Sequence, residues 1–302
     1  MENILPYSMY NALKKLKYNG VYELRLRVNK PCVVNYFNSP YYLSTDGITN
    51  QVSRAIICSE EDVNMVVNSA SNYSLYAINE QLKNGFITIN GGVRIGVVGQ
   101  VVTENGKVLT VKNFSSLNIR FPHQVKGIAN DIINYLLKDD EILNTLIISP
   151  AGAGKTTLLR DLVRLISNDY KKNILLIDER NEISSTVDGV MQMDLGDFCD
   201  VIVSSTKYDG FINGIRSMGP EIVATDEIGT LDDIKAIEYA TCAGVNVLAT
   251  IHSKNIDELL KKQNIEGIIK NKLFDRYIVL SSKNGKGTVE AIYNENFINI
   301  KE

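Results

Sequence analysis

The stretch "TLIISPAGAGKTTLLRD", residues 145–161, constrains the fold of this chain more than any other feature of its sequence. Its apolar start is typical of a buried strand, and its end has the three- and four-residue spacing of an amphipathic helix. Glycines in the turn between them let successive backbone N–H groups face an anion, close to the positive end of the helix dipole. This order of strand, glycine-rich turn and helix predicts a phosphate-binding loop in an α/β domain.

The turn matches the phosphate-loop pattern GxxxxGK[ST] except at its first position, which is Ser149. Lys155 is placed to reach the β- and γ-phosphates of a nucleotide, and the Thr156 hydroxyl is placed to bind Mg²⁺. A purely structural glycine turn is the alternative interpretation, but the flanking strand and helix favour a site for ATP and Mg²⁺. The predicted nucleotide-binding residues are Ser149, Pro150, Ala151, Gly152, Ala153, Gly154, Lys155, Thr156 and Thr157.

The helix after the turn is predicted from the spacing of its apolar residues. The residues expected to pack inward are Leu158, Leu159, Leu162, Val163 and Ile166. The same spacing predicts that Arg160, Asp161 and Arg164 face outward.

Two further apolar strands end in acidic residues. "ILLIDERNE" ends in Asp178, Glu179 and Glu182, and "EIVATDEIG" ends in Asp226 and Glu227. A P-loop ATPase needs one carboxylate to hold hydrated Mg²⁺ and another to orient the attacking water, both at the carboxyl ends of strands near the loop. We favour Asp226 for the metal and Glu227 for the water, with Glu179 as an auxiliary carboxylate. The alternative is that acidic residues simply follow buried strands at the surface.

A histidine and several arginines are candidates for sensing or stabilising the γ-phosphate. His252 ends the strand in "VNVLATIHSK" at the same sheet edge, where its imidazole or the Thr250 hydroxyl could contact that phosphate. Phosphoryl transfer also gains from positive charge on the transferred group, often from a neighbouring subunit. The candidate arginines are Arg94, Arg120, Arg180 and Arg216, and the sequence does not choose among them. An ordinary surface role is the alternative for each of these side chains.

The first part of the chain has the pattern of a small α+β domain. Apolar spacing predicts a helix that stops near Gly20, a strand at "VYELRLRV", and a helix with Ser59 as its N-cap and Asp62 three residues on. A further helix is expected at "LYAINEQLKN", and strands over residues 86–120 with a hairpin turn at Asn105 and Gly106. We expect this N-terminal domain to span residues 1–125.

After "RFPHQVKG" the pattern changes to apolar strands that alternate with helices. This alternation predicts a mostly parallel sheet with crossover helices. Residues 126–302 are therefore expected to form an α/β domain, and the chain to have two domains.

Charge and apolar segments limit the classes of partner. The net charge of -3 and the pI near 5.6 argue against a polyanion as the main partner, so no nucleic acid is expected. Four cysteines are scattered without metal-type spacing, which favours a reducing compartment and structural roles. No apolar run approaches the roughly 18 residues of a spanning helix, so we expect a cytoplasmic protein with no direct membrane insertion.

The motifs together resemble a known superfamily. The order of "SPAGAGKTT", "IDERNEI", "IRSMGPEIVATDEIG" and "ATIHS" resembles the type II/type IV secretion (traffic) ATPases. Within that superfamily, "ELRLRVNKP", "SLYAINEQLKNGFITINGGVRIGVVGQVV", "SSLNIRFP" and "RSMGPEIVATDEIG" resemble the stage III sporulation protein AA family of endospore-forming bacteria. These motifs lie in both predicted domains, so the resemblance covers nearly the whole chain.

The resemblance implies a RecA-like P-loop ATPase that assembles into a ring, expected to be a hexamer. It places the protein in the mother cell, peripheral to the membrane that surrounds the engulfed forespore. Its implied partners are membrane proteins of a secretion-like complex between the two compartments, which it would energise.

The resemblance also implies roles for individual residues. Lys155 and Thr156 match the family's P-loop, Asp178, Glu179 and Glu182 its acidic box, Asp226 and Glu227 its second acidic motif, and His252 its histidine box. Arg120 lies in the stretch from which secretion ATPases contribute nucleotide-contacting arginines. The expected catalytic residues are Glu227, Glu179, Lys155, Arg120 and His252, and the expected metal ligands are Thr156 and Asp226. Two positions differ from the superfamily, Ser149 in the loop and Gly229, where an arginine is usual.

Three functions follow from these observations. The leading hypothesis is a mechanical ATPase in which closure over Mg²⁺-ATP turns hydrolysis into domain motion. The two differences from the superfamily motivate an alternative, an ATP-gated assembly scaffold with little or no turnover. A nucleic-acid-dependent ATPase is the third, because RecA-like folds serve several functions, but the acidic balance disfavours it.

Overall fold

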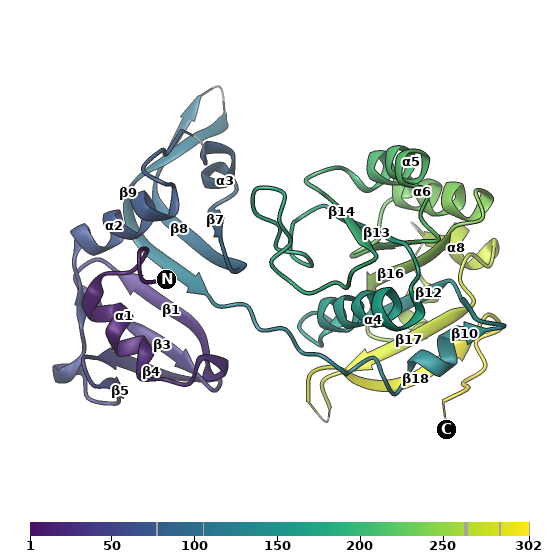
Figure 1. The fold of residues 1–302 in the computed structure, drawn as a ribbon, viewed down its shortest axis with the longest axis horizontal. Helices are drawn as coiled ribbons and strands as arrows, with labels where there is room; N and C mark the ends of the chain where they lie inside the picture. The colour runs from purple at the N-terminus through teal and green to yellow at the C-terminus, as the bar shows by residue number, and fades with distance from the viewer. Residues whose placement is uncertain (77, 105, 263–264, 284, 302) are drawn as a thin grey trace. The chain divides into compact units, whose positions relative to one another are not determined.

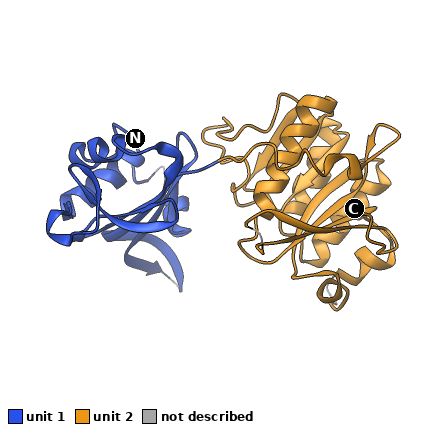
Figure 2. Ribbon diagram, turned by 90° about the horizontal axis from the view of Figure 1, so that it is seen from below, with its two compact units in different colours: residues 1–123 blue, residues 124–302 orange. Residues whose placement is uncertain are grey.

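The computed structural model describes residues 1–76, 78–104, 106–262, 265–283 and 285–301. It forms two compact units, residues 1–123 and residues 124–302 (Figures 1 and 2). Each unit has a hydrophobic core of its own.

Unit 1 is built on a seven-stranded sheet in which all neighbouring strands are antiparallel. The strand order is β5-β4-β3-β1-β9-β8-β7. The strands are β1 (Val21–Arg27), β3 (Val33–Tyr36), β4 (Ser39–Ser44), β5 (Gly47–Thr49), β7 (Phe86–Ile89), β8 (Val93–Glu104) and β9 (Lys107–Arg120), with β2 (Lys30–Pro31) and β6 (Ile57–Cys58) as a separate pair. The helices are α1 (Tyr7–Lys14), α2 (Glu60–Ala70) and α3 (Asn79–Lys83), and the 3₁₀ turns are η1 (Tyr18–Gly20) and η2 (Val52–Arg54).

Local signals predicted several of these elements. The Ser59 hydroxyl accepts the Asp62 N–H at 3.1 Å and the Asp62 carboxylate accepts the Ser59 N–H at 2.8 Å, which confirms the capping box of α2. The predicted hairpin is present, since Glu104 of β8 pairs with Lys107 of β9 and Gly106 has a φ of 74°. Asn105, the other predicted turn residue, lies outside the described residues. The helix expected over 75–84 is shorter, because α3 begins only at Asn79.

Unit 2 contains the mostly parallel sheet that the sequence predicted. Its order is β14-β13-β15-β16-β12-β17-β18, and β18 alone among these strands runs antiparallel to its neighbour. The strands are β12 (Thr145–Ser149), β13 (Ile174–Asp178), β14 (Cys199–Val203), β15 (Ile222–Thr225), β16 (Asn246–His252), β17 (Arg276–Ser281) and β18 (Thr288–Asn294), and β10 (Leu137–Lys138) pairs separately with β11 (Glu141–Ile142). The helices are η3 (Ile133–Leu136), α4 (Lys155–Tyr170), α5 (Lys207–Met218), α6 (Leu231–Cys242), α7 (Ile256–Leu260) and α8 (Glu266–Lys270).

Helices cover both faces of this sheet (Figure 1). Successive side chains of a strand point to opposite faces, so Ile147 of β12 packs with α4, while Leu146 and Ile148 pack in the core that contains α5 to α8. Strands buried on both faces read as continuous apolar runs, and all five residues of β12 are buried. The turn at the end of β12 is thereby held by a fully packed strand.

The orientation predicted for α4 is wrong at two positions. Arg160 and Asp161 were expected to face solvent, but Arg160 is 9% exposed and Asp161 is 0% exposed. Asp161 accepts the Ala129 N–H at 2.9 Å and forms an ion pair with Arg164 at 2.8 Å. Helical spacing could not reveal this, because the segment before β10 packs on the polar side of α4 and supplies its own hydrogen-bond donor.

We predict that Asp161→Ala lowers the free energy of unfolding by about 3 kcal/mol, because it leaves a buried amide and a mostly buried guanidinium without their acceptor. Asp169→Ala is the matched control on the same helix, where the side chain is exposed and the change should stay within about 0.5 kcal/mol. Urea denaturation of both variants measures the difference. Equal effects would show that the Asp161 contacts contribute no stability.

Candidate functional site

Four adjacent strands of unit 2 bring the predicted site residues to one edge of the sheet. In the parallel register Ser149 of β12 lies beside His252 of β16, and Thr225 of β15 lies beside both Ala249 and Ile177. Asp226 and Glu227 follow Thr225 directly. The carboxyl ends of parallel strands meet at the same edge, which is where α/β sheets bind their ligands.

The predicted phosphate loop has the backbone of an anion site. Gly152 and Gly154 have φ values of 74° and 102°, and α4 starts at Lys155 with no side chain capping its first turn. The first amides of α4 therefore keep donors for an anion. The Ser149 hydroxyl, at the position where a glycine is usual, is buried and donates to the Pro150 carbonyl at 2.8 Å.

The turn between β17 and β18 packs against this loop. The Gly287 N–H donates to the Ala153 carbonyl at 2.8 Å. A Cβ atom at Gly154 would lie 3.1 Å from the Gly287 nitrogen and 3.3 Å from its Cα. Gly154 is therefore required both for its positive φ and for the close approach of the second turn.

Glu227 lies between two cations. Lys155 donates to one of its carboxylate oxygens, and Arg180 donates to the other at 2.8 Å. The hydrogen bond from Lys155 is the largest cause that lowers the pKa of the Glu227 carboxyl. The backbone is fixed as well, since Glu227 has a φ of 46° and its N–H donates to the Thr250 hydroxyl at 2.9 Å. The structure thus joins the loop lysine to the carboxylate predicted to act on water.

Asp226 has the environment of a metal-binding carboxylate. It is 3% exposed, and burial, followed by the charge of Asp178, raises the pKa of its carboxyl to about 6. A divalent cation would reverse this cost by stabilising the ionised form. The described residues contain no group of three or more His, Cys, Asp or Glu that could hold a metal. Asp226 and the Thr156 hydroxyl are the predicted ligands of Mg²⁺, an ion that keeps several waters and binds through few protein oxygens and substrate phosphates.

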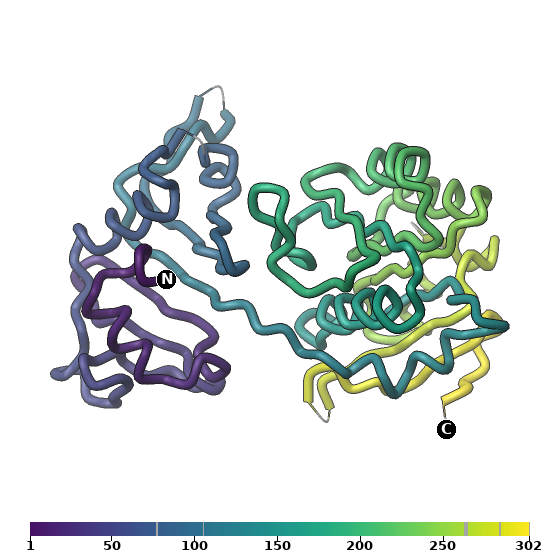
Figure 3. Tube along the Cα trace, viewed as in Figure 1, coloured from purple at the N-terminus to yellow at the C-terminus, as the bar shows by residue number. Residues whose placement is uncertain are grey.

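Asp178 organises the loop that follows β13. Its carboxylate is 0% exposed and accepts the N–H groups of Glu182, Ile183 and Ser184 at 2.8 to 3.1 Å, as well as the Ser184 hydroxyl at 2.7 Å. These bonds start the long connection 179–198 from β13 to β14, which Figure 3 traces. The role of the acidic box at Asp178 is therefore to shape this connection.

Arg160 of α4 fixes the same connection from the other side. Its guanidinium donates to the Ile183 carbonyl at 2.7 Å and to the Glu182 carbonyl at 2.8 Å. The helix that begins at the phosphate loop and the acidic box that begins at Asp178 are thereby hydrogen-bonded to each other. The sequence analysis missed this link, because Arg160 was assigned to the exposed side of α4.

Lys207 was also missed. It begins α5, its side chain is 9% exposed, and its ammonium pairs with Glu179 at 2.5 Å. The sequence did contain one sign that Lys207 is unusual. It directly follows the N-cap Thr206, where the helix dipole disfavours a cation and acidic residues are favoured. Glu179, predicted as an auxiliary carboxylate, is thus held by a residue from another strand–helix connection.

The remaining candidates lie in different places. His252 ends β16 with an exposed side chain, and its carbonyl accepts a hydrogen bond from Lys262. Arg120 belongs to unit 1, at the end of β9, and pairs with Glu23 at 3.4 Å. Arg94 stacks on the Phe86 ring in unit 1, and Arg216 donates to the Tyr239 hydroxyl on α6. Of the four candidate arginines, Arg180 contacts a predicted catalytic residue.

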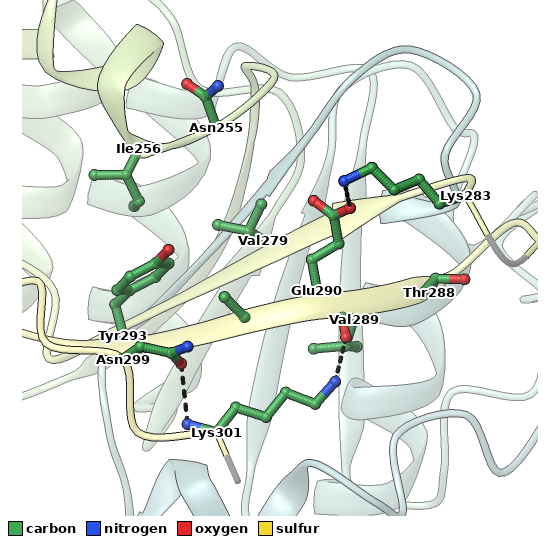
Figure 4. Close-up of a pocket in the computed structure, with 11 residues that line it drawn as sticks. Asn255, Ile256, Val279, Lys283, Thr288, Val289, Glu290, Tyr293, Asn299 and Lys301 are labelled. Carbon is green, nitrogen blue, oxygen red and sulfur yellow. Dashed lines mark hydrogen bonds and ion pairs between the residues drawn. The ribbon is translucent and has the colours of Figure 1, made fainter.

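A pocket of about 610 Å³ lies elsewhere in unit 2, between α7, the β17–β18 hairpin and the last residues of the chain (Figure 4). Its polar side chains include Asn255, Lys283, Glu290 and Lys301, and the sticks in Figure 4 show Lys283 directed at Glu290. None of the predicted site residues lines it.

No described helix is long and apolar enough to cross a membrane.

Comparisons with known proteins support the same fold. The family model for sporulation stage III protein AA matches residues 1–300. Stage III sporulation protein AA of Bacillus subtilis (strain 168) is 40% identical over 300 residues, which cover 97% of this chain and 94% of that protein. The Legionella pneumophila ATPase DotB aligns with a TM-score of 0.58 at 15% identity, over 92% of this chain and 77% of that chain.

A second solved structure, the pilus retraction motor PilT with bound ADP, aligns with a TM-score of 0.58 at 15% identity, over 86% of this chain and 74% of that chain. At these identities the likeness shows the fold. The fold class expected from the sequence, a RecA-like α/β domain preceded by a smaller α+β domain, is confirmed.

We predict that Gly154→Ala lowers the free energy of unfolding by about 2 kcal/mol more than Gly152→Ala. Both substitutions strain a positive φ, but only the Cβ at residue 154 meets the β17–β18 turn, and overpacking of this kind costs about 1–3 kcal/mol. Denaturant unfolding without nucleotide measures the difference. Equal losses in the two variants would contradict the predicted contact with Gly287.

Proposed function

The chain belongs to the sporulation stage III protein AA family, as its motifs predicted, and we propose that it is a Mg²⁺-dependent ATPase that converts ATP hydrolysis into domain motion. The observation that carries this proposal is the contact between Lys155 and Glu227. It brings the lysine of a phosphate loop to the carboxylate that follows a neighbouring strand. The fold shared with ATPases such as DotB and PilT supports the same function.

Binding and hydrolysis would use the residues at the sheet edge in defined roles. The amides of residues 152–157 would hold the phosphates. Lys155 would turn from Glu227 to the phosphates, because a triphosphate carries more negative charge than one carboxylate. Asp226 and Thr156 would hold Mg²⁺, which would neutralise charge that develops on the phosphates. His252 lies in register with Ser149 of the loop strand, so we assign it to sensing the γ-phosphate.

Glu227 would become the group that orients water once Lys155 has turned away. Its main chain stays fixed by the Thr250 hydroxyl, so the carboxylate can move without displacing the strand end. Arg180 would remain as its partner from the acidic box. As the family resemblance implies, Arg120 is proposed to contribute positive charge to the transferred phosphate.

The cellular role follows from the family. We propose that the chain assembles into a ring, expected to be a hexamer, in the mother cell, against the membrane around the forespore. There it would energise a secretion-like complex of membrane proteins between the two compartments. The B. subtilis relative of 40% identity over nearly the full length supports the sporulation role.

An ATP-gated assembly scaffold is the second candidate. Glu227 is paired with two cations, and a carboxylate whose pKa is lowered in this way is a weak base toward water. Gly229 also follows the second acidic motif where secretion ATPases usually have an arginine. Tight ATP binding without hydrolysis, in the oligomer and with membrane partners present, would favour the scaffold over the mechanical ATPase.

Two substitutions test the ATPase. Lys155→Ala should weaken the binding of an ATP analogue about 10- to 100-fold, because it removes a charged hydrogen bond to phosphate. Glu227→Gln should preserve binding and lower kcat by about 10²- to 10⁴-fold, because it removes the carboxylate that acts on water. The exposed Lys235 gives the control variant Lys235→Ala, which should match the unsubstituted protein in both measurements. Phosphate release unchanged in both test variants would refute the site.

Assembly is tested by molecular mass in solution. We expect light scattering to detect a larger species when a non-hydrolysable ATP analogue and Mg²⁺ are added, because nucleotide binding would join subunits in a ring. The protein could instead stay monomeric with and without nucleotide, also when membrane partners are added to the sample. It could then not receive an arginine from a neighbouring subunit. That result would remove the ring from the proposal.

A further inference from the structure

Lys207 occupies an electrostatically costly position. Its side chain is 9% exposed, and a buried ammonium loses hydration that one ion pair repays only in part. It also begins α5, where the helix dipole disfavours a cation. Nothing in the packing of α5 requires a charge there, since the core residues of this helix are Phe211 and Ile215. The surrounding charges must therefore account for this residue.

Those surroundings are acidic. The ammonium of Lys207 donates to the Glu179 carboxylate at 2.5 Å. Glu179 is the residue that directly follows β13, which ends at Asp178. The charge of Lys207 also acts on two other carboxyls. Burial and Asp178 raise the pKa of Asp226, and Lys207 offsets part of that rise. Lys155 and Arg180 lower the pKa of Glu227, and Lys207 adds to that effect. One buried cation thus faces carboxylates from the ends of two neighbouring strands, β13 and β15.

Glu179 depends on this contact more than the other carboxylates do. Asp178 is fixed by four hydrogen bonds from its own loop, and Glu227 is fixed by two cations and by Thr250. Glu179 has a side chain that is 39% exposed, and its described ionic contact is the one to Lys207. Without that contact an exposed glutamate would sample several rotamers.

We propose that Lys207 is a positioning residue for ATP hydrolysis, which holds the Glu179 carboxylate at the sheet edge from which Asp226 and Glu227 also extend. This inference rests on the proposed function and adds to it the first residue of α5. Lys207 acts through Glu179 and does not itself touch nucleotide.

A structural ion pair predicts a different outcome. If Lys207 only stabilised α5, its removal would lower stability and leave the hydrolysis of the folded protein intact. A positioning residue predicts lower kcat with unchanged KM, because substrate binding depends on the phosphate loop while the reaction depends on the placement of carboxylates. A misplacement of about 1 Å in a reacting group lowers rates by about 10²-fold.

The experiment uses full-length protein and three lysine variants. Lys207→Met should lower kcat by about 10²-fold and leave KM unchanged. Lys207→Arg keeps the positive charge and should therefore retain most of the rate. The matched control is Lys172→Met, since Lys172 pairs with Glu221 at 2.9 Å at the opposite end of β15. Thermal unfolding by circular dichroism verifies that each variant is folded. Wild-type kcat in folded Lys207→Met would overturn the proposal.

A double variant separates action through Glu179 from an independent effect. If Lys207 acts through Glu179, Lys207→Met combined with Glu179→Gln should lose no more activity than Glu179→Gln alone. Losses that multiply would overturn the proposed route. If Lys207→Met does not fold, Lys207→Gln, which removes the charge but keeps a polar side chain, takes its place in both comparisons.

The two levels of the proposal fail in different ways. Absence of nucleotide binding and hydrolysis in the unsubstituted protein would overturn the ATPase, and the role of Lys207 with it. Hydrolysis in the unsubstituted protein that Glu227→Gln abolishes and Lys207→Met leaves intact would overturn the role of Lys207 alone.

Discussion

A parallel sheet brings the carboxyl ends of its strands to one edge, and the candidate site depends on this constraint. The predicted phosphate loop follows β12, the acidic box follows β13, the second acidic pair follows β15, and the histidine ends β16. These strands are adjacent in the order β13-β15-β16-β12, although they are separated by long stretches of sequence. Burial on both faces fixes their register, since a slip by one residue would turn apolar side chains out of both cores.

Concentrating carboxylates at one edge creates an electrostatic cost that the fold offsets with cations from three elements. Lys155 comes from the start of α4, Arg180 from the acidic box and Lys207 from the start of α5. Asp226 is the exception, because burial and the charge of Asp178 raise the pKa of its carboxyl. A site with one under-compensated carboxylate among compensated ones is suited to a divalent cation that arrives with its substrate.

The same contacts link binding to conformation. The Lys155 ammonium cannot pair fully with both Glu227 and a triphosphate, so bound nucleotide would weaken its ion pair with Glu227. Glu227 would then keep Arg180, a residue of the connection 179–198, as its cationic partner. Arg160 and Asp178 hold the first turn of that connection rigidly on α4. Long ordered connections of this kind are usually functional.

The sequence by itself determined the glycine turn between β12 and α4, the acidic strand ends, the capping box at Ser59 and the mostly parallel sheet. These features depend on residues close together in the chain, where periodicity and turn chemistry act directly. Only the tertiary structure decided which charges meet. Asp161 is buried by a segment more than 30 residues away, Asp178 turns to its own loop, and Lys207 reaches Glu179 across 28 residues. Helical spacing treats a charged residue as exposed, because it has no information on a distant donor or acceptor that makes burial favourable.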